Sequence, residues 1–122
     1  SDASCPCGSG ATFGGCCAPL LAGEPAPSVE QLMRSRYTAF AVGDAAYLQR
    51  TWHPRTRPET VAIDPGLRWS GLEIVEVVEG TDDGIVAFRA HWDDAGETGV
   101  LAERSRFARR TGRWFYVDGD VS

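Results

Sequence analysis

The sequence predicts an α+β fold preceded by a small metal-binding module. Residues 28–52 place apolar side chains at helical spacing, whereas residues 67–118 fall into short alternating runs separated by turn-forming residues. Helices followed by consecutive antiparallel strands are typical of α+β domains. All four cysteines lie within residues 5–17, and this cluster predicts the separate module.

Length, composition and charge restrict the class of protein. The 122 residues suffice for one domain of ordinary size and a small appendage, and the hydrophobic content of 43% supports a packed core. No apolar run approaches the ~20 residues that cross a bilayer, and no basic-then-apolar signal segment begins the chain. We therefore expect a cytoplasmic protein without a membrane partner. The formal net charge of −5 argues against nucleic-acid binding, which normally needs a basic excess.

The cysteines follow the spacing C-x-C, eight residues, then C-C, within a glycine-rich segment. Thiols this close together fit one tetrahedral metal site whose ligands are Cys5, Cys7, Cys16 and Cys17. Thiolates are soft ligands that suit zinc, with iron as the alternative occupant. Four sulfur ligands leave no position for water or substrate, so we expect a structural site.

Two disulfide bonds are the alternative interpretation of the same cysteines. A bond between the adjacent Cys16 and Cys17 would be strained, but Cys5–Cys16 together with Cys7–Cys17 stays possible. Disulfides need an oxidising compartment, which no feature of the chain indicates. The metal site is therefore the preferred interpretation, and the disulfide pairing stays open at this point.

The segment Cys-Pro-Cys-Gly-Ser-Gly at residues 5–10, followed by the pair Cys16-Cys17, resembles the SEC-C motif. This small zinc module is best known at the C-terminus of the SecA translocation ATPase. The resemblance implies that residues 1–19 form a zinc-binding module that contacts a protein partner. Members of that family usually have basic residues between the two cysteine pairs. Residues 11–15 have none here, so the resemblance does not extend to SecB, the partner of SecA.

Residues 18–27 contain three prolines, which disfavour a helix and favour extended backbone. We therefore place a connector at residues 20–27, between the module at residues 1–19 and a separately folded body at residues 28–122. The module is expected to lie on or beside that body.

Two helices are expected at the start of the body. Ser28 has the chemistry of an N-cap, and Gly43 suits the C-terminal stop of the first helix. The apolar face of this helix comprises Val29, Leu32, Met33, Tyr37 and Phe40. Asp44 caps a second, short helix over Ala45–Trp52, which Pro54 ends.

A proline-containing loop over residues 53–66 leads into four expected strands. Their bounds are Leu67–Val78, Gly84–Asp93, Gly99–Ala108 and Arg113–Asp118. The intervening segments are rich in turn formers such as glycine and aspartate, so the strands are expected to form an antiparallel meander.

The last hairpin allows its register to be predicted. If Thr111-Gly112 is a two-residue turn, Arg110 lies opposite Arg113. The further pairs are then Arg109 with Trp114, Phe107 with Tyr116, and Ser105 with Asp118. One face of the hairpin would thus carry an aromatic cluster beside a polar patch.

Further motifs in the body resemble the bacterial YchJ family. They are Arg34-Ser-Arg-Tyr-Thr-Ala-Phe40, Thr51-Trp-His-Pro54, Trp69-Ser-Gly-Leu72, Glu103-Arg-Ser-Arg-Phe107 and Gly112-Arg-Trp-Phe-Tyr-Val-Asp-Gly119. That family couples an N-terminal SEC-C module to a domain resembling nuclear transport factor 2, in which a curved antiparallel sheet wraps around helices into a cone. The resemblance implies this fold for nearly the whole chain. It implies no activity, because the family is functionally uncharacterised.

Cones of this type often hold a pocket between the sheet and the helices, and the chain offers candidates for lining it. The acid–base candidates are His91, Glu103 and His53, since imidazole titrates near neutral pH and a carboxylate can share a proton with it. The further pocket candidates are Trp52, Ser105, Tyr116, Asp118 and Arg36. In the alternative interpretation these residues only hold the body together, with a buried Arg36 paired to Glu103 or Asp118.

Two functions stay open on these grounds. The first is a non-enzymatic adaptor whose closed zinc module presents a rigid surface to a protein partner. The second is an enzyme or small-ligand-binding protein that uses the cone pocket, with His91 and Glu103 as acid and base. Whether His91 points into a cavity separates the two.

Overall fold

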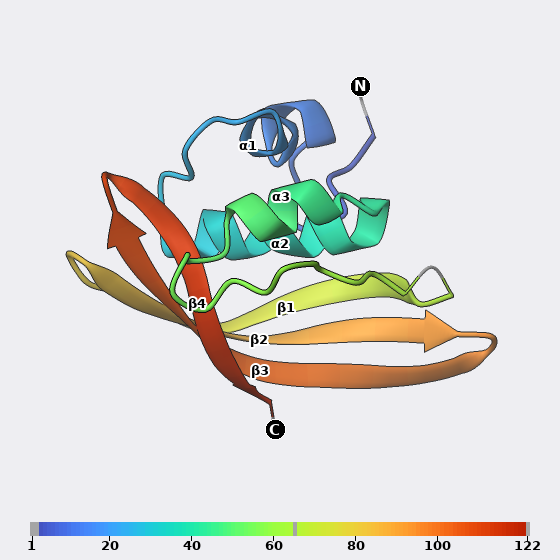
Figure 1. Cartoon of the computed structure of the whole chain (residues 1–122). Helices are drawn as coiled ribbons and strands as arrows, with labels where there is room; N and C mark the ends of the chain where they lie inside the picture. Colours follow the sequence, from blue (N-terminus) through green and yellow to red (C-terminus); the bar gives the residue numbers. More distant parts are fainter. Residues whose placement is uncertain (1–2, 65, 122) are drawn as a thin grey trace.

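A computed structural model describes residues 3–64 and 66–121. The described residues form a helical layer on the concave face of a four-stranded antiparallel sheet, which confirms the predicted α+β class (Figure 1). The elements in chain order are η1 (Phe13–Gly15), α1 (Ala18–Leu21), α2 (Val29–Val42), α3 (Ala45–Arg50), β1 (Arg68–Glu79), β2 (Asp83–Asp94), β3 (Glu97–Arg110) and β4 (Arg113–Val121). The strand order β1-β2-β3-β4 is a simple meander.

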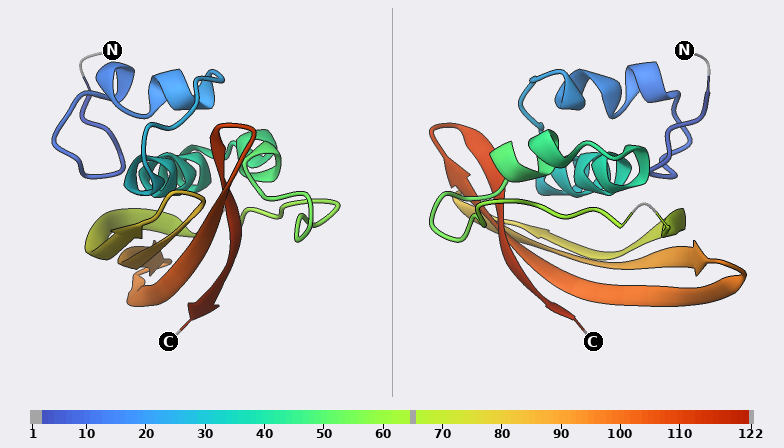
Figure 2. Two further views of the ribbon diagram at one scale, coloured as in Figure 1. Left: turned by 90° about the vertical axis from the view of Figure 1, so that its left-hand side faces the viewer. Right: turned by 45° about the vertical axis from the view of Figure 1, so that its right-hand side comes forward.

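The sheet is curved, and its concave face partly encloses α2. Figure 2 shows that α2 lies directly on the concave face, with the N-terminal segment and α1 on the other side of α2. The turn between β3 and β4 rises beside the helices, so β4 closes one side of the space under α2. None of the helices in the described part of the chain is both long and apolar enough to cross a membrane.

Local capping explains where the helices of the body begin and end. The Ser28 side chain accepts a hydrogen bond from the backbone N–H at the start of α2, and Gly43 ends this helix in the left-handed region at φ 84°. Asp44 caps α3 in the same way. The predicted second helix to Trp52 is too long, because α3 ends at Arg50.

Residues 18–27 are not wholly extended, contrary to the prediction. Ala18–Leu21 form one helical turn, with Pro19 in its first turn. The missing N–H of a proline costs nothing there, since the first N–H groups of a helix have no intrahelical partner. Leu20 is buried against α2 and α3, so a packing contact fixes this turn.

The turn between β3 and β4 has the two-residue form that the sequence predicted. Thr111 and Gly112 both have positive φ, 51° and 79°, as the favoured hairpin turns require. The pairs Arg110 with Arg113, Arg109 with Trp114, and Phe107 with Tyr116 are all confirmed.

The predicted pair of Ser105 with Asp118 is wrong. A β-bulge after the Phe107–Tyr116 pair adds Val117 to β4 as an unmatched residue, so Ser105 lies opposite Gly119. An extra residue reverses the face to which all following side chains point. Asp118 therefore lies on the outer face, where it pairs with Arg106.

One hydrophobic core joins the N-terminal segment to the body. It contains Cys5, Cys7 and Cys17 together with side chains of α2 and the inward-facing residues of the sheet. A smaller cluster under α1 and α3 comprises Leu20, Ala39, Tyr47 and Leu48. The N-terminal segment therefore packs closely against α2, whereas the boundary at residues 20–27 stays a prediction.

Candidate functional site

The four cysteines form a compact cluster of sulfur atoms. Their Sγ atoms all lie within 4.8 Å of one another, and the cluster could hold one metal ion. The Sγ atom of Cys16 lies 3.6 Å from that of Cys7 and 3.9 Å from that of Cys17. All four thiols are free, because these separations far exceed the S–S bond of about 2.05 Å.

Glycines in the N-terminal loop bring the two cysteine pairs together. Gly8 and Gly10 have φ values of 76° and 88°. Residues other than glycine adopt such backbone angles only at a cost in free energy. The backbone N–H of Cys5 donates to the carbonyl of Ala11, which closes the loop at 2.9 Å. Gly8 and Gly10 thus use the conformational freedom of glycine, whereas Gly14 and Gly15 lie in η1 without positive φ.

Donors surround the sulfur atoms. Thr38 Oγ1 on α2 donates to Cys17 Sγ at 3.3 Å, and Gln31 Nε2 on the same helix donates to Cys16 Sγ at 3.6 Å. Ser9 Oγ lies 3.2 Å from Cys16 Sγ. Hydrogen bonds to sulfur stabilise thiolate charge, as expected for residues that support a metal ligand from behind.

The thiols of the cluster influence one another. A hydrogen bond from Cys17 lowers the pKa of Cys7, and the same bond raises the pKa of Cys17. Burial raises the pKa of Cys5. The cluster therefore retains protons in the absence of an ion, and a metal would have to displace them in order to bind.

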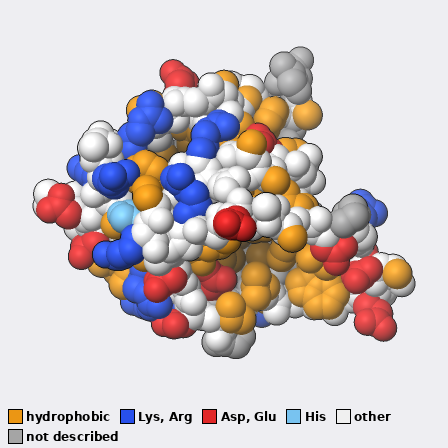
Figure 3. Space-filling view, viewed as in Figure 1, with side chains coloured by type: hydrophobic (Ala, Val, Ile, Leu, Met, Phe, Trp, Pro, Cys, Tyr) orange, Lys and Arg blue, Asp and Glu red, His pale blue; other side chains and the backbone are white. Residues whose placement is uncertain are grey.

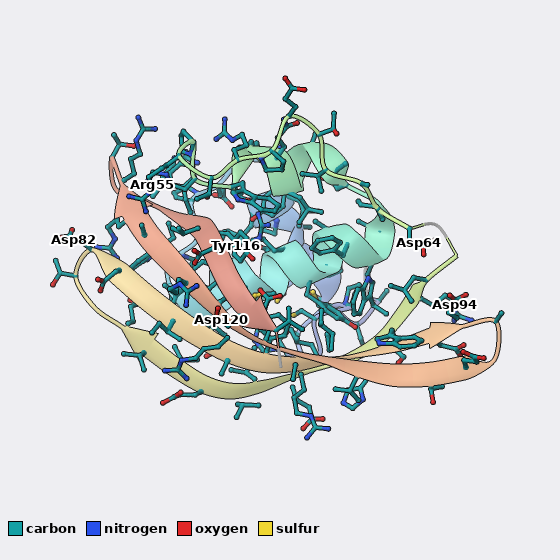
Figure 4. All side chains as sticks on the ribbon, turned by 60° about the horizontal axis from the view of Figure 1, so that its bottom comes forward. Arg55, Asp64, Asp82, Asp94, Tyr116 and Asp120 are labelled. Atoms are coloured by element: carbon teal, nitrogen blue, oxygen red, sulfur yellow. The ribbon has the colours of Figure 1, made fainter. Side chains whose placement is uncertain are left out.

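A second candidate site is a cavity between α2 and the concave face of the sheet. It has a volume of about 200 Å³, and most of its wall is aromatic or aliphatic. Its polar lining comes from Arg36 on α2 and from Glu103 and Ser105 on β3, with Trp52 and Tyr116 as aromatic members of the wall. Figure 3 shows hydrophobic side chains gathered in the hollow beneath the helical layer. In Figure 4, Tyr116 lies over the concave side of the sheet, between β4 and α2.

Arg36 is buried, with only 3% of its surface exposed. Its Nη1 group donates to the carbonyl of Leu48 at 2.9 Å, in the last turn of α3, and to Oγ1 of Thr51, the residue after that helix, at 2.7 Å. Its guanidinium lies 4.5 Å from the ring centre of Tyr116 and 5.3 Å from that of Trp52. Burial lowers the pKa of Arg36 to about 10, so it stays charged at neutral pH.

Glu103 is held by neighbours other than Arg36. Its Oε2 atom accepts a hydrogen bond from Ser105 Oγ at 2.7 Å and another from Tyr116 OH at 3.2 Å. The predicted direct ion pair of Arg36 with Glu103 or Asp118 is wrong, since the only charge-paired groups of the described residues lie elsewhere. Within that described part of the chain, Arg36 contacts carbonyl, hydroxyl and aromatic groups, and the charge of Glu103 acts on it without direct contact.

Three predicted site residues lie outside the cavity. His91 is on the outer face of the sheet, where its Nε2 atom lies 2.6 Å from Glu73 Oε1. His53 is in the loop after α3, and its Nδ1 atom accepts from the backbone N–H of Arg55. Asp118 is also on the outer face because of the bulge in β4. The structure thus brings five of the eight candidates together: Arg36, Trp52, Glu103, Ser105 and Tyr116.

Other residues of the cavity wall were not predicted. They include Met33, Tyr37 and Phe40 of α2 and Trp69 of β1. The sequence did carry a signal for the three helical residues. They belong to the predicted apolar face of the first helix, on which Arg36 also lies. The sequence offers no comparable signal for Thr38 and Gln31 beside the thiols, since these contacts span many residues.

Comparison with known families identifies the body of the chain. A family model described as the middle, NTF2-like domain of YchJ matches residues 28–119. A UPF0225 protein of Streptomyces coelicolor is 50% identical over 120 residues, covering 95% of this chain and 94% of that protein. A UPF0225 protein of Streptomyces avermitilis is 51% identical over 122 residues, covering 97% of this chain and 84% of that protein.

Solved structures extend the likeness to the N-terminal segment. The solution structure of a SEC-C motif protein from Rhodopseudomonas palustris superposes with a TM-score of 0.88 at 35% identity, covering 97% of this chain and 98% of that one. The crystal structure of a SEC-C motif protein from Psychrobacter arcticus has a TM-score of 0.81 at 24% identity, covering 97% and 82%. The second likeness concerns the fold alone.

Proposed function

The chain belongs to the YchJ family, with an NTF2-like body and a SEC-C motif, and we propose that it is a zinc-containing, non-enzymatic protein-interaction module. The observation that carries the proposal is the set of four cysteine sulfur atoms within 4.8 Å of one another. A tetrahedral site with Zn–S bonds of about 2.3 Å has S–S edges of about 3.8 Å. The separations of 3.6 Å and 3.9 Å around Cys16 lie close to that edge.

The donor set favours zinc in a structural role. Thiolates are soft ligands that bind zinc well, with iron as the alternative, and hard cations such as Mg²⁺ prefer oxygen. Four thiolates complete the tetrahedron, so the ion would have no open position for a substrate. Because Cys5, Cys7 and Cys17 are buried against α2, the ion would fasten the N-terminal loop to the body.

The proposed interaction surface is the outer side of the zinc loop. Residues 8–12 are exposed, while the cysteines on the inner side are buried or half-buried. A loop fixed by an ion presents its exposed side at a small cost in conformational entropy, which favours binding of a protein partner. The proposal places the protein in the cytoplasm, where free thiols stay reduced.

The metal site is tested by native mass spectrometry of the untagged protein purified without added metal. One zinc ion per chain is expected, and Cys16→Ser should lose it, because a four-coordinate site depends on complete ligation. Ala11→Ser, in the same loop but outside the ligand set, serves as the matched control. A metal-free mass that is four hydrogens light, or zinc retained by Cys16→Ser, would show the site as described to be wrong.

The interaction role is tested separately from the metal. Ala11→Arg places a long charged side chain on the exposed loop without touching a ligand, and it should abolish co-purification of the partner from native extract. His91→Ala, on the opposite side of the molecule, should leave co-purification intact. Equal capture by wild type and Ala11→Arg, with zinc still bound, would contradict the adaptor role of this loop.

A second function is favoured by the cavity: binding of a small molecule. A mostly apolar cavity with a few convergent polar groups is the usual form of a ligand site. Here Arg36 and Glu103 supply the polar groups, within a wall that contains several aromatic rings. The enzyme with His91 and Glu103 as an acid–base pair has no support in the geometry, because His91 faces away from the cavity.

A further inference from the structure

The loop that follows α3 is held against β4 by several hydrogen bonds. The backbone N–H of His53 donates to the carbonyl of Tyr116 at 2.7 Å, and the N–H of Tyr116 donates to the carbonyl of Thr51 at 2.8 Å. Thr56 Oγ1 donates to the carbonyl of Val117 at 2.7 Å. The backbone of the loop is therefore fixed, and the side chains that it presents to solvent start from a defined position.

Exposed arginines gather around this loop. Figure 3 shows basic side chains over the region where α3 and the β3–β4 hairpin lie in Figure 1, and Figure 4 shows Arg55 beside that hairpin. Partial burial and then the charges of Arg55, Arg110 and Arg57 hold the pKa of His53 below its usual range, which indicates a positive potential here. We define the basic patch as the exposed residues Arg50, Arg55, Arg57, Arg110 and Arg113.

No arginine of the basic patch forms an ion pair within residues 3–64 and 66–121. The arginines that do so are Arg34, Arg104 and Arg106. Arg50 and Arg113 donate instead to the backbone carbonyls of Leu21 and Gly23. A chain with a formal net charge of −5 thus has one surface where positive charges lack carboxylate contacts. Guanidinium groups suit carboxylates, which they can bind through two parallel hydrogen bonds.

A small pocket adjoins the basic patch. Its volume is about 80 Å³, and its wall includes Arg50, Arg113, Trp114 and Phe115. Phe115 connects the pocket to the loop, because its ring centre lies 6.2 Å from that of His53. A cavity known to hold benzene measures about 150 Å³. The pocket is therefore too small for an aromatic ring or a nucleobase, and it suits a small aliphatic side chain.

From these observations we propose that the basic patch and the adjoining pocket bind an acidic segment of a protein partner, in which neighbouring carboxylates lie beside a small aliphatic side chain. The carboxylates would contact Arg55, Arg57 and Arg110. Glu24 in the pocket wall disfavours a carboxylate there, so the aliphatic side chain would enter the pocket. This surface is separate from the zinc loop, and its binding does not require the metal ion.

A nucleic acid is the other class of polyanion that arginines attract. Its phosphates would match the basic patch, but its bases are too large for the pocket. A strand longer than the patch would also meet the acidic remainder of the chain. A short acidic peptide avoids both conflicts.

Labelled peptides test the proposal by fluorescence anisotropy with the zinc-loaded full chain at low ionic strength. The probe is Gly-Asp-Glu-Asp-Val-Gly. Replacing its acidic residues by Asn-Gln-Asn should weaken binding about tenfold, because three exposed ion pairs of a few-fold each are lost. Replacing its valine by tryptophan, which does not fit the pocket, or by glycine should weaken binding about fivefold. A single-stranded dT6 oligonucleotide should bind more weakly than the probe.

Two double variants with the same change in net charge locate the binding surface. Arg55→Glu with Arg110→Glu reverses two exposed charges of the basic patch and should weaken binding of the probe at least tenfold. Arg68→Glu with Arg89→Glu reverses two exposed charges on β1 and β2 and should change it less than twofold. Ala11→Arg in the zinc loop should not weaken it, which separates this surface from the one proposed for the adaptor.

Each outcome decides part of the proposal. Equal losses in the two double variants, or equal binding of the acidic and the amide peptide, would overturn the basic patch as the binding surface. Tighter binding of dT6 than of the probe would assign the patch to nucleic acid instead. Equal binding of the valine and tryptophan peptides would remove the pocket from the site. Should the patch variant fail to fold, the peptide series in the wild type still decides.

Discussion

The thiol cluster and the aromatic cavity are built on opposite faces of one helix, but they are assembled from very different parts of the sequence. Successive residues of an α-helix are about 100° apart, which places Gln31 and Thr38 on one face and Arg36 and Phe40 on the other. The ligands of the cluster come from residues 5–17. The wall of the cavity comes from residues between Met33 and Tyr116, on six different segments.

A sequence locates a site most directly when the residues of that site are close together in the chain. In the cluster, short chain segments close on themselves, so spacing alone locates the ligands. In the cavity, the wall depends on strand register and on which face of each strand turns inward. The two regions should therefore respond differently to perturbation, the cluster to loss of its ion and the cavity to changes in single buried groups.

Metal removal should have the largest effect, and it should affect one region only. Chelation under reducing conditions should abolish protection from hydrogen exchange over residues 3–21, because the loop has few backbone hydrogen bonds of its own. Protection in β2 and β3 should persist, since their ladders do not involve the loop. Added zinc should restore the loop signals. Unchanged protection of residues 3–21 after complete metal loss would show that the loop folds without an ion.

Arg36→Ala should have the next largest effect, and on the body rather than the loop. The substitution removes two charge-assisted hydrogen bonds to Leu48 and Thr51 and leaves a void under Tyr116. We expect the free energy of unfolding to fall by about 3 kcal/mol, measured by urea denaturation. Arg89→Ala, on the exposed outer face of β2, is the matched control and should change it by less than about 0.5 kcal/mol. Similar losses in both variants would contradict the structural role of Arg36.

Thr38→Val should act on the cluster through its surroundings. Valine keeps the shape of threonine but removes the hydroxyl that donates to Cys17 Sγ at 3.3 Å. Loss of a supporting hydrogen bond behind a metal ligand typically weakens metal binding by about 10–100-fold. Competition with a chromophoric chelator measures the change, and Thr38→Ser should retain wild-type affinity. Equal weakening by both substitutions would point to packing rather than to the hydrogen bond.

His91→Ala should have the smallest effect. Its side chain and that of Glu73 are exposed on the outer face of the sheet, and pairs of this kind contribute little to stability. The free energy of unfolding, measured by urea denaturation, should match that of the wild type. A fall of more than about 0.5 kcal/mol would show that this exposed pair contributes more than surface pairs usually do.

The parts of the fold that follow local rules could be predicted from the sequence. The caps at Ser28, Gly43 and Asp44 and the turn at Thr111-Gly112 each depend on one or two residues with special backbone or side-chain chemistry. The one-turn helix α1 differs from the predicted extended connector because the effect of a proline depends on its position. Pro19 stands where a helix tolerates proline.

The candidate site was only partly predictable, for two different reasons. The outward position of His91 could have been inferred, because Val86, Phe88 and Ala90 alternate as the buried face of β2 and leave His91 on the other face. The position of Asp118 could not, since the only nearby signal is Gly119, and a glycine in a strand indicates a bulge or a close approach without locating the extra residue. One unpaired residue was enough to move a carboxylate from the cavity to the surface.

The bulge at Val117 sets the face of the sheet to which every later side chain of β4 points. Beyond it, each side chain faces the way it does only because one residue has been inserted into the strand. Many substitutions at this position could preserve the pattern, but a one-residue deletion would turn Asp118 toward the cavity and Gly119 away from Glu103. In related sequences, the number of residues between Tyr116 and Gly119 should therefore vary less than their identity.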